Sequence, residues 1–206
     1  MSKPHINVML DLETFGTKDF SVIISIGAVC FDPTKTGSDA IVSEFHVTID
    51  PADAQKRGLR LDADTVCWWL APEQASAWHD WYNTPHVQLD VALDGFSEFL
   101  RENLTYAETD TPDDGKRDTY ELREQVTLWG NGPQFDCSLL RQAYQVCQRD
   151  APWQHYGERC FRTMKNLPGA RPLVVPHEGL QHNALVDARQ QALWLCNILK
   201  HVGAIN

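Results

Sequence analysis

Two acidic residues near the start of the chain are spaced so that they could bind a cation. Asp11 and Glu13 follow the apolar run 8–10 and are separated by one residue. Residues two apart in a strand point to the same face, so both carboxylates can converge on one ion. Acid-x-acid triplets are common by chance, but a charged pair directly after a buried strand is costly unless it binds metal.

A third acidic residue, Asp136, follows a glycine-containing turn. The preceding sequence predicts a strand over 125–129, a turn over 130–133 and then the start of a helix. Such a turn exposes backbone N–H groups and lets a phosphate approach closely. A carboxylate in the first turn of a helix is also favoured by the helix dipole alone, so this position by itself leaves both interpretations open.

His182 and Asp187 stand at the beginning of the last predicted helix. Asn183 can cap that helix, which places Asp187 in its first turn and His182 just outside it. The two side chains would then flank one opening. Each also has a plainer interpretation, because a histidine here can be a capping or solvated residue and an aspartate can simply stabilise the dipole.

Taken in order, these positions supply four carboxylates and one imidazole. Mg²⁺ prefers oxygen ligands, and two such ions held by shared carboxylates can activate a water and stabilise the leaving oxygen of a phosphodiester. A set of this kind could therefore support metal-dependent hydrolysis of a phosphodiester.

The elements that must position these residues are strands first and then helices alternating with later strands. Apolar and alternating runs predict strands over 6–12, 21–30, 41–49 and 125–129, with a short strand or turn over 158–164. Helical spacing predicts helices around 64–70, 72–81, 89–103, 135–146 and 184–199. This order indicates an α/β fold with a mixed five-stranded sheet flanked by helices.

The composition predicts one globular domain over residues 1–206. The polar stretch 105–124 has little to bury and is expected to be an insertion within that domain. No apolar run approaches the roughly 20 residues of a membrane span, and Asp11 and Glu13 interrupt any signal-peptide pattern. The six cysteines show no zinc spacing and are expected to be reduced thiols, which together predicts a cytoplasmic protein without membrane partners.

The net charge of −10 argues against broad electrostatic adhesion to nucleic acid or anionic lipid. It does not exclude an enzyme that acts on nucleic acid, because ions bound by a carboxylate site cancel its negative charge.

The ordered set resembles the DEDDh branch of the DnaQ-like 3′-5′ exonucleases, which have a ribonuclease-H-like fold. Three further stretches resemble the phage exodeoxyribonuclease A proteins and their bacterial 3′-5′ exoribonuclease-like relatives. They are TVCWWL at 65–70, WGNGPQFD at 129–136, and Arg162-Thr163 ahead of HNALVDA at 182–188. The resemblance covers roughly residues 8–195. The chain departs from proofreading relatives, which usually have Asp-Thr where this chain has Arg162-Thr163, and the 105–124 stretch has no counterpart in them.

The resemblance implies a role for each member of the set. Asp11, Glu13 and Asp187 would hold one Mg²⁺ or Mn²⁺ ion. Asp11 would also bridge to a second ion, with Asp136 acting directly or through water, and His182 would be the general base. The implied reaction releases 5′-mononucleotides from the 3′ end of DNA or RNA. A catalytically weak nucleic-acid-binding or assembly protein on the same fold is the alternative.

Contacts with nucleic acid are less specific in the sequence. Trp68 and Trp69 could offer a stacking surface, but adjacent helical residues face about 100° apart, so at most one is expected to do so. Either ring could instead occupy a core position or a dimer contact, which leaves a homodimer open. Arg162 could contact a phosphate or belong to a solvated basic face. The predicted nucleic-acid-binding residues are Leu12, Thr14, Trp69, Asn131, Phe135 and Arg162.

Overall fold

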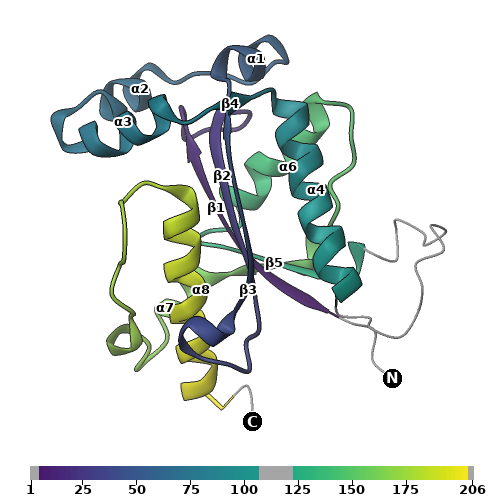
Figure 1. Ribbon diagram of the computed structural model, residues 1–206, viewed down its shortest axis with the longest axis vertical. Coiled ribbons are helices and arrows are strands. Elements are labelled where there is room, and N and C mark those ends of the chain that lie inside the picture. Colours follow the sequence, from purple (N-terminus) through teal and green to yellow (C-terminus); the bar gives the residue numbers. More distant parts are fainter. Residues whose placement is uncertain (1–4, 107–122, 204–206) are drawn as a thin grey trace.

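A computed structural model describes residues 5–106 and 123–203, and within these residues six strands form one mixed sheet (Figure 1). The strands are β1 (Ile6–Thr14), β2 (Ile23–Phe31), β3 (Ile41–Ile49), β4 (His86–Val87), β5 (Val126–Gly130) and β6 (Glu158–Cys160). Their order is β4-β3-β2-β1-β5-β6. β2 pairs antiparallel with β1 and β3, and the other pairs are parallel. The predicted α/β mixed sheet is confirmed. It has one strand more than the five predicted, because β4 is too short to give a pattern.

The described helices are α1 (Pro51–Lys56), α2 (Ala63–Trp69), α3 (Ala75–Asn83), α4 (Leu89–Tyr106), α6 (Asp136–Val146), α7 (Phe161–Lys165) and α8 (Ala184–His201). α4 continues three residues beyond its predicted end at Asn103. The predicted polar insertion lies outside the described residues over 107–122. Among the described residues, no helix is long and apolar enough to cross a membrane.

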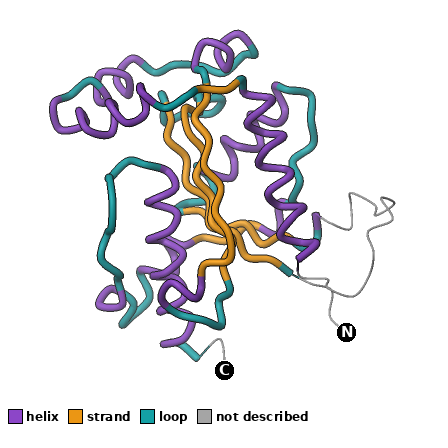
Figure 2. Tube along the Cα trace, viewed as in Figure 1, coloured by secondary structure: helices purple, strands orange, loops and turns teal. Residues whose placement is uncertain are grey.

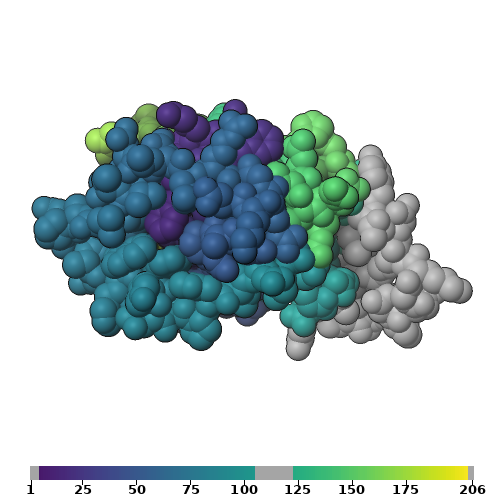
Figure 3. All heavy atoms as spheres, turned by 90° about the horizontal axis from the view of Figure 1, so that it is seen from above, coloured from purple at the N-terminus to yellow at the C-terminus, as the bar shows by residue number. Residues whose placement is uncertain are grey.

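Helices cover both faces of the sheet. α7 and α8 lie on one face, and α4 and α6 lie on the other (Figures 1 and 2). Each face has its own apolar core: Leu93 and Leu140 belong to the core beneath α4 and α6, and Ala188 and Leu195 to the core beneath α8. α1, α2 and α3 form the upper end of the molecule, which faces the viewer in Figure 3.

Strand β1 runs between these two cores, and its side chains alternate between them. Val8 and Leu10 pack in the core of α4 and α6, whereas Met9 packs in the core of α8. Because successive side chains of a strand point to opposite faces, Asp11 and Glu13 continue the row of Met9. The sequence of β1 therefore directs both carboxylates towards α8.

Candidate active site

All five residues of the predicted catalytic set line one cleft of about 390 Å³. The cleft lies where the end of β1 meets the beginnings of α6 and α8, and α7 forms another part of its wall. Residues separated by more than 170 positions in the sequence thus meet at one place. The set that the sequence predicts is brought together by the fold.

A glycine in β2 allows α8 to begin beside the carboxylates of β1. Gly27 pairs with Asp11 across the β1–β2 ladder. A Cβ atom at Gly27 would lie 2.1 Å from the backbone carbonyl carbon of Ala184, which is the first residue of α8. No side chain fits in that space. The absence of a side chain at Gly27 therefore lets the helix that carries Asp187 approach the sheet.

The first turn of α8 holds Asp187 and His182 in a fixed relation. The Asn183 side chain caps the helix as predicted, accepting hydrogen bonds from the amides of Leu185 and Val186. His182 has a positive φ of 59°, and its backbone N–H donates to Oδ2 of Asp187 at 3.2 Å. A non-glycine residue in this backbone region is uncommon and marks a position that its surroundings must hold.

A cation-binding geometry is present at one side of the cleft. Ligand atoms of Glu13, His182 and Asp187 all lie within 4.8 Å of one another. Oxygen-rich sets of this kind suit Mg²⁺ or Mn²⁺.

The electrostatics of the carboxylates also favour a cation. Burial, followed by the negative charges of Asp187 and Asp136, raises the pKa of Glu13 to about 8. Burial and the charges of its three acidic neighbours raise the pKa of Asp11 well above its ordinary value, against a hydrogen bond from Gln191 that lowers it. Carboxylates that repel one another in a buried place bind protons or metal ions in preference to remaining ionised alone.

Asp136 faces these residues from the first turn of α6. Burial raises its pKa to about 7, although hydrogen bonds from backbone amides, including that of Leu12, and the charge of Arg162 act in the opposite direction. Gly130 makes room for it, since a Cβ atom there would lie 3.1 Å from Oδ2 of Asp136.

The predicted nucleic-acid-binding residues divide into two groups. Leu12, Asn131, Phe135 and Arg162 line the cleft. Thr14 and Trp69 do not line it. Arg162 lies beside Gly132, where a Cβ atom would be 3.5 Å from Nη2 of the guanidinium group.

The structure corrects the prediction for Thr14 and Trp69. The Trp69 side chain is only 2% exposed and donates its indole N–H to the Thr14 carbonyl at 2.9 Å, so it offers no free stacking face. The Thr14 hydroxyl is buried and donates to the carbonyl of Gly16. Trp68 is the exposed member of the pair, at 43%, and its ring centre lies 5.0 Å from that of His182 in an edge-to-face arrangement.

Several residues of the site, among them His177, Gln191 and Trp194, were not predicted from the sequence. Nε2 of His177 lies 2.6 Å from Oδ1 of Asp187, and Gln191 donates to Asp11. Lys165 and Trp194 also line the cleft, with the Lys165 ammonium group 5.9 Å from the Trp194 ring centre. A signal was present for Gln191, which follows Asp187 by four residues and therefore shares its helical face. His177 lies outside any predicted helix or strand, so periodicity gave no sign of it.

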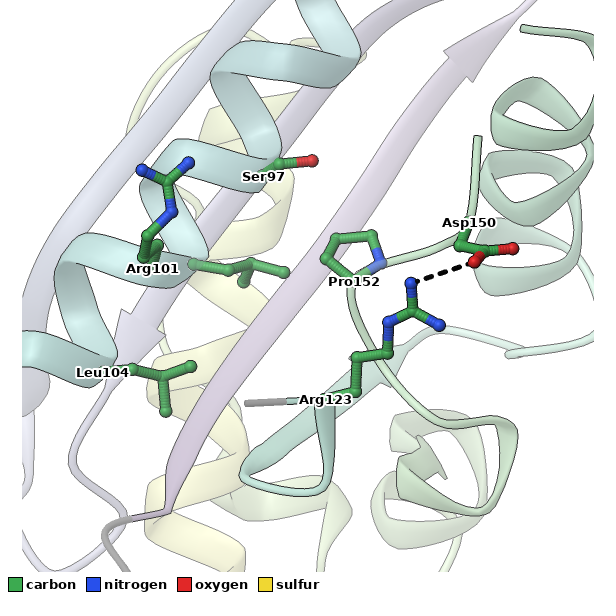
Figure 4. Close-up of a pocket in the computed structure, with 7 residues that line it drawn as sticks. Ser97, Arg101, Leu104, Arg123, Asp150 and Pro152 are labelled. Carbon is green, nitrogen blue, oxygen red and sulfur yellow. Dashed lines mark hydrogen bonds and ion pairs between the residues drawn. The ribbon is translucent and has the colours of Figure 1, made fainter. Parts of the chain in front are cut away.

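A second hollow, of about 220 Å³, lies away from these carboxylates between α4 and the loop after α6 (Figure 4). Its wall includes Ser97, Leu100 and Leu104 of α4. The charged groups that face it include Arg123 and Asp150, which form an ion pair at 3.2 Å. Arg101 also lines this hollow and pairs with Glu98, so its charged groups have ion-pair partners of opposite sign.

Comparison with known proteins identifies the family. The model of the 3′-5′ exoribonuclease Rv2179c-like domain matches residues 6–199. No curated protein sequence matches the chain significantly. Among solved structures, the chain is similar to the nuclease domain of 3′hExo, a DEDDh family member bound to rAMP. The identity is 12%, the TM-score is 0.61, and the alignment covers 100% of this chain and 96% of that one.

Two further structures have the same fold. One is a 3′-exonuclease solved in a study of 3′-end-specific recognition of the histone mRNA stem-loop, with 11% identity, a TM-score of 0.58, and coverage of 98% of this chain and 84% of that one. The other is E. coli exonuclease I in complex with a dA16 oligonucleotide. The identity is 15%, the TM-score is 0.52, and the alignment covers 96% of this chain and 41% of that one. Together with the family model, these similarities confirm the predicted resemblance to DEDDh exonucleases. The chain therefore belongs to the family of 3′-5′ exoribonuclease Rv2179c-like domains and is a 3′-5′ exonuclease with a ribonuclease-H-like fold.

Proposed function

We propose that the chain is a single exonuclease domain that removes 5′-mononucleotides from the 3′ end of DNA or RNA with the help of two divalent ions. The observation that carries this proposal is the convergence of four carboxylates, one of them buried and three half-buried, and one imidazole in a single cleft. The raised pKa values of Asp11, Glu13 and Asp136 support it, because a bound cation would offset the effect of burial on all three and the mutual repulsion that adds to it at Asp11 and Glu13.

The resemblance to DEDDh exonucleases divides the carboxylates between two ions. Asp11, Glu13 and Asp187 would hold the first, and Asp11 and Asp136 the second. Mg²⁺ or Mn²⁺ would supply activation of the attacking water and neutralisation of the charge that develops on the departing 3′ oxygen.

His182 would be the general base. Its imidazole would take the proton of the attacking water as the new bond to phosphorus forms. Its backbone hydrogen bond to Asp187 and the edge-to-face contact with Trp68 hold the residue at the carboxylate edge of the cleft. A general base must lie within hydrogen-bonding reach of the proton that it removes, and this position beside Glu13 and Asp187 supports the role.

Cations on α7 would hold the phosphates of the substrate. Arg162 and Lys165 are one helical turn apart and both line the cleft. They would bind the scissile phosphate or the one before it, with Asn131 and Phe135 beside the terminal nucleotide. The family description makes RNA the first substrate to test, and DNA the second.

The cellular location and the oligomeric state of the enzyme are also proposals. All six cysteines are free thiols in the structure, which supports a cytoplasmic location because the cytosol keeps thiols reduced. A homodimer stays a hypothesis, to be tested by measuring the mass in solution.

A time course on labelled oligonucleotides tests the proposed function. A 5′-labelled single strand of RNA or DNA should give a ladder that shortens from the 3′ end in Mg²⁺ or Mn²⁺ and stays intact in EDTA. A 3′-phosphate should slow or block the reaction, and a circular single strand should remain uncut. Tight binding without cleavage would instead support the binding-protein alternative, and a cut in the circle would indicate an endonuclease.

A further inference from the structure

Helix α8 and strand β1 face each other through two successive pairs of side chains. Asp187 lies close to Glu13, and four residues later Gln191 contacts Asp11. Four residues of a helix rise about 6 Å, and two residues of a strand rise about 6.6 Å, so the two pairs stay in step when the elements run in opposite directions. Gln191 and Asp11 therefore face each other for the same geometric reason as Asp187 and Glu13, although Gln191 is not a member of the catalytic set.

Gln191 is held against Asp11 by burial and by one hydrogen bond. Its side chain is 7% exposed, and Nε2 donates to Oδ1 of Asp11 at 2.8 Å. When Asp11 is ionised, as it must be to bind a cation, the amide of Gln191 has to donate to it, because the flipped amide would place two acceptor oxygens against each other. Its carbonyl oxygen Oε1 is buried and has no hydrogen-bond partner within the described part of the chain.

We infer that Gln191 is a positioning residue for the metal site, an inference that rests on the proposed function. Its amide fixes Oδ1 of Asp11 and so leaves Oδ2 directed to the cation. A neutral donor suits this task, because a lysine or arginine here would compete with the cation for the charge of Asp11. The unpartnered Oε1 is an acceptor for a water that enters the cleft with the cation, since buried acceptors without a partner are unfavourable.

A purely structural role for Gln191 is the competing hypothesis, and the chain offers a matched control. Gln125 is also a buried glutamine, at 5% exposed, and its Oε1 also has no partner within the described residues. Gln125 does not line the cleft. If burial alone matters, replacing either glutamine by methionine should have the same consequences.

Titration calorimetry with Mn²⁺ on Gln191→Met, Gln125→Met and the wild type separates the two hypotheses. We expect the dissociation constant for Mn²⁺ to rise about 10- to 100-fold in Gln191→Met, the usual effect of losing a hydrogen bond to a metal ligand, and to stay unchanged in Gln125→Met. The melting temperature without metal should differ little between the variants. The turnover of Gln191→Met should fall at limiting Mn²⁺ and recover at saturating Mn²⁺.

A second variant covers the case in which Gln191→Met folds poorly. Gln191→Asn keeps the amide but shortens it, so it too should bind Mn²⁺ more weakly. Wild-type Mn²⁺ affinity in a folded Gln191 variant overturns the inference, and cleavage by the wild type would leave the proposed function standing. If the wild type itself binds no Mn²⁺, the inference and the proposed function are both contradicted.

Discussion

Two regions of this molecule differ in whether their carboxylates have arginine partners. On the side of α4 and α6, each of several acidic residues has an arginine partner, as in the ion pairs Asp53–Arg57 and Asp150–Arg123. Asp94 pairs with Arg149, and Glu158 with an arginine of α6, in the same manner. In the cleft, no lysine or arginine of the described residues forms an ion pair with the four carboxylates. The protein thus provides arginines for carboxylates elsewhere and none for these four, which supports the proposed cation site.

The pKa values express the same difference. Burial acts to raise the pKa of Asp53, but hydrogen bonds from Arg57 and the Leu89 amide and the charge of Arg57 bring it below its ordinary value. For Glu13, burial and neighbouring charges act together and raise the pKa to about 8. A paired carboxylate is stable as it is, whereas the cleft becomes stable in its ionised form only with bound cations.

Among variants that should still bind metal, the largest expected effect separates the imidazole of the cleft from its carboxylates. His182→Ala should lower turnover by about 10²- to 10⁴-fold, the usual contribution of one general base, while Mn²⁺ and oligonucleotide still bind. Turnover, binding and melting temperature are to be measured together. Near-normal turnover with a lowered melting temperature would mean that His182 only shapes the start of α8.

The next effect concerns the approach of α8 to the cleft. Gly27→Ala should cost about 1–3 kcal/mol of unfolding free energy, because its new methyl group overlaps the Ala184 backbone. Turnover should fall as well, since displacement of α8 moves Asp187. Gly95→Ala on α4 is the control, because its Cβ would meet only the edge of the Phe45 ring at 3.3 Å. Equal turnover in both variants would contradict a positioning role for Gly27.

The raised pKa values predict how the metal-free protein responds to pH. Glu13, with a pKa of about 8, and Asp136, with a pKa of about 7, keep protons in the folded state that the unfolded chain releases near pH 4. The folded state therefore binds more protons between about pH 4 and 8, so its stability should fall as pH rises through that window.

Urea unfolding in EDTA across this range measures the effect. Saturating Mn²⁺ should reverse the trend, and Glu13→Gln should remove part of the fall. A metal-free stability that rises from pH 5 to 8 would show that the carboxylates are not mutually repelled.

The smallest effect belongs to the paired region. Arg123→Met removes an ion pair whose Asp150 side chain is 83% exposed, and exposed pairs contribute only about 0–1 kcal/mol. The variant should melt within a few degrees of the wild type and bind Mn²⁺ equally well. A change in Mn²⁺ affinity here would break the distinction between the two regions.

The residues of the proposed catalytic set could be picked out from the sequence because the position of each is encoded locally. The two-residue spacing of Asp11 and Glu13 fixes their common face in β1, and Asn183 signals the beginning of α8. The helix and strand order was enough for a mixed sheet, but not for β4, which forms only because residues 86 and 87 lie beside the end of β3.

Contacts between elements could not be predicted in this way. Which of Trp68 and Trp69 is exposed depends on whether the indole N–H reaches the carbonyl of Thr14, a contact across 55 positions. The fit of Gly27 against Ala184 and the contact between His177 and Asp187 likewise arise only when distant segments pack. Periodicity shows which face of an element is buried, but it does not show what lies opposite.

The central claim is that the four carboxylates that no lysine or arginine of the described residues pairs with form a cation site that drives hydrolysis from the 3′ end. The most direct test is the rate of shortening of a 5′-labelled oligonucleotide, measured against Mn²⁺ concentration for the wild type and for purified, folded Asp11→Ala. The wild-type rate should rise from zero in EDTA to saturation, and Asp11→Ala should show no cleavage at any Mn²⁺ concentration. Cleavage by the wild type in EDTA, or by Asp11→Ala at the wild-type rate, would contradict the claim.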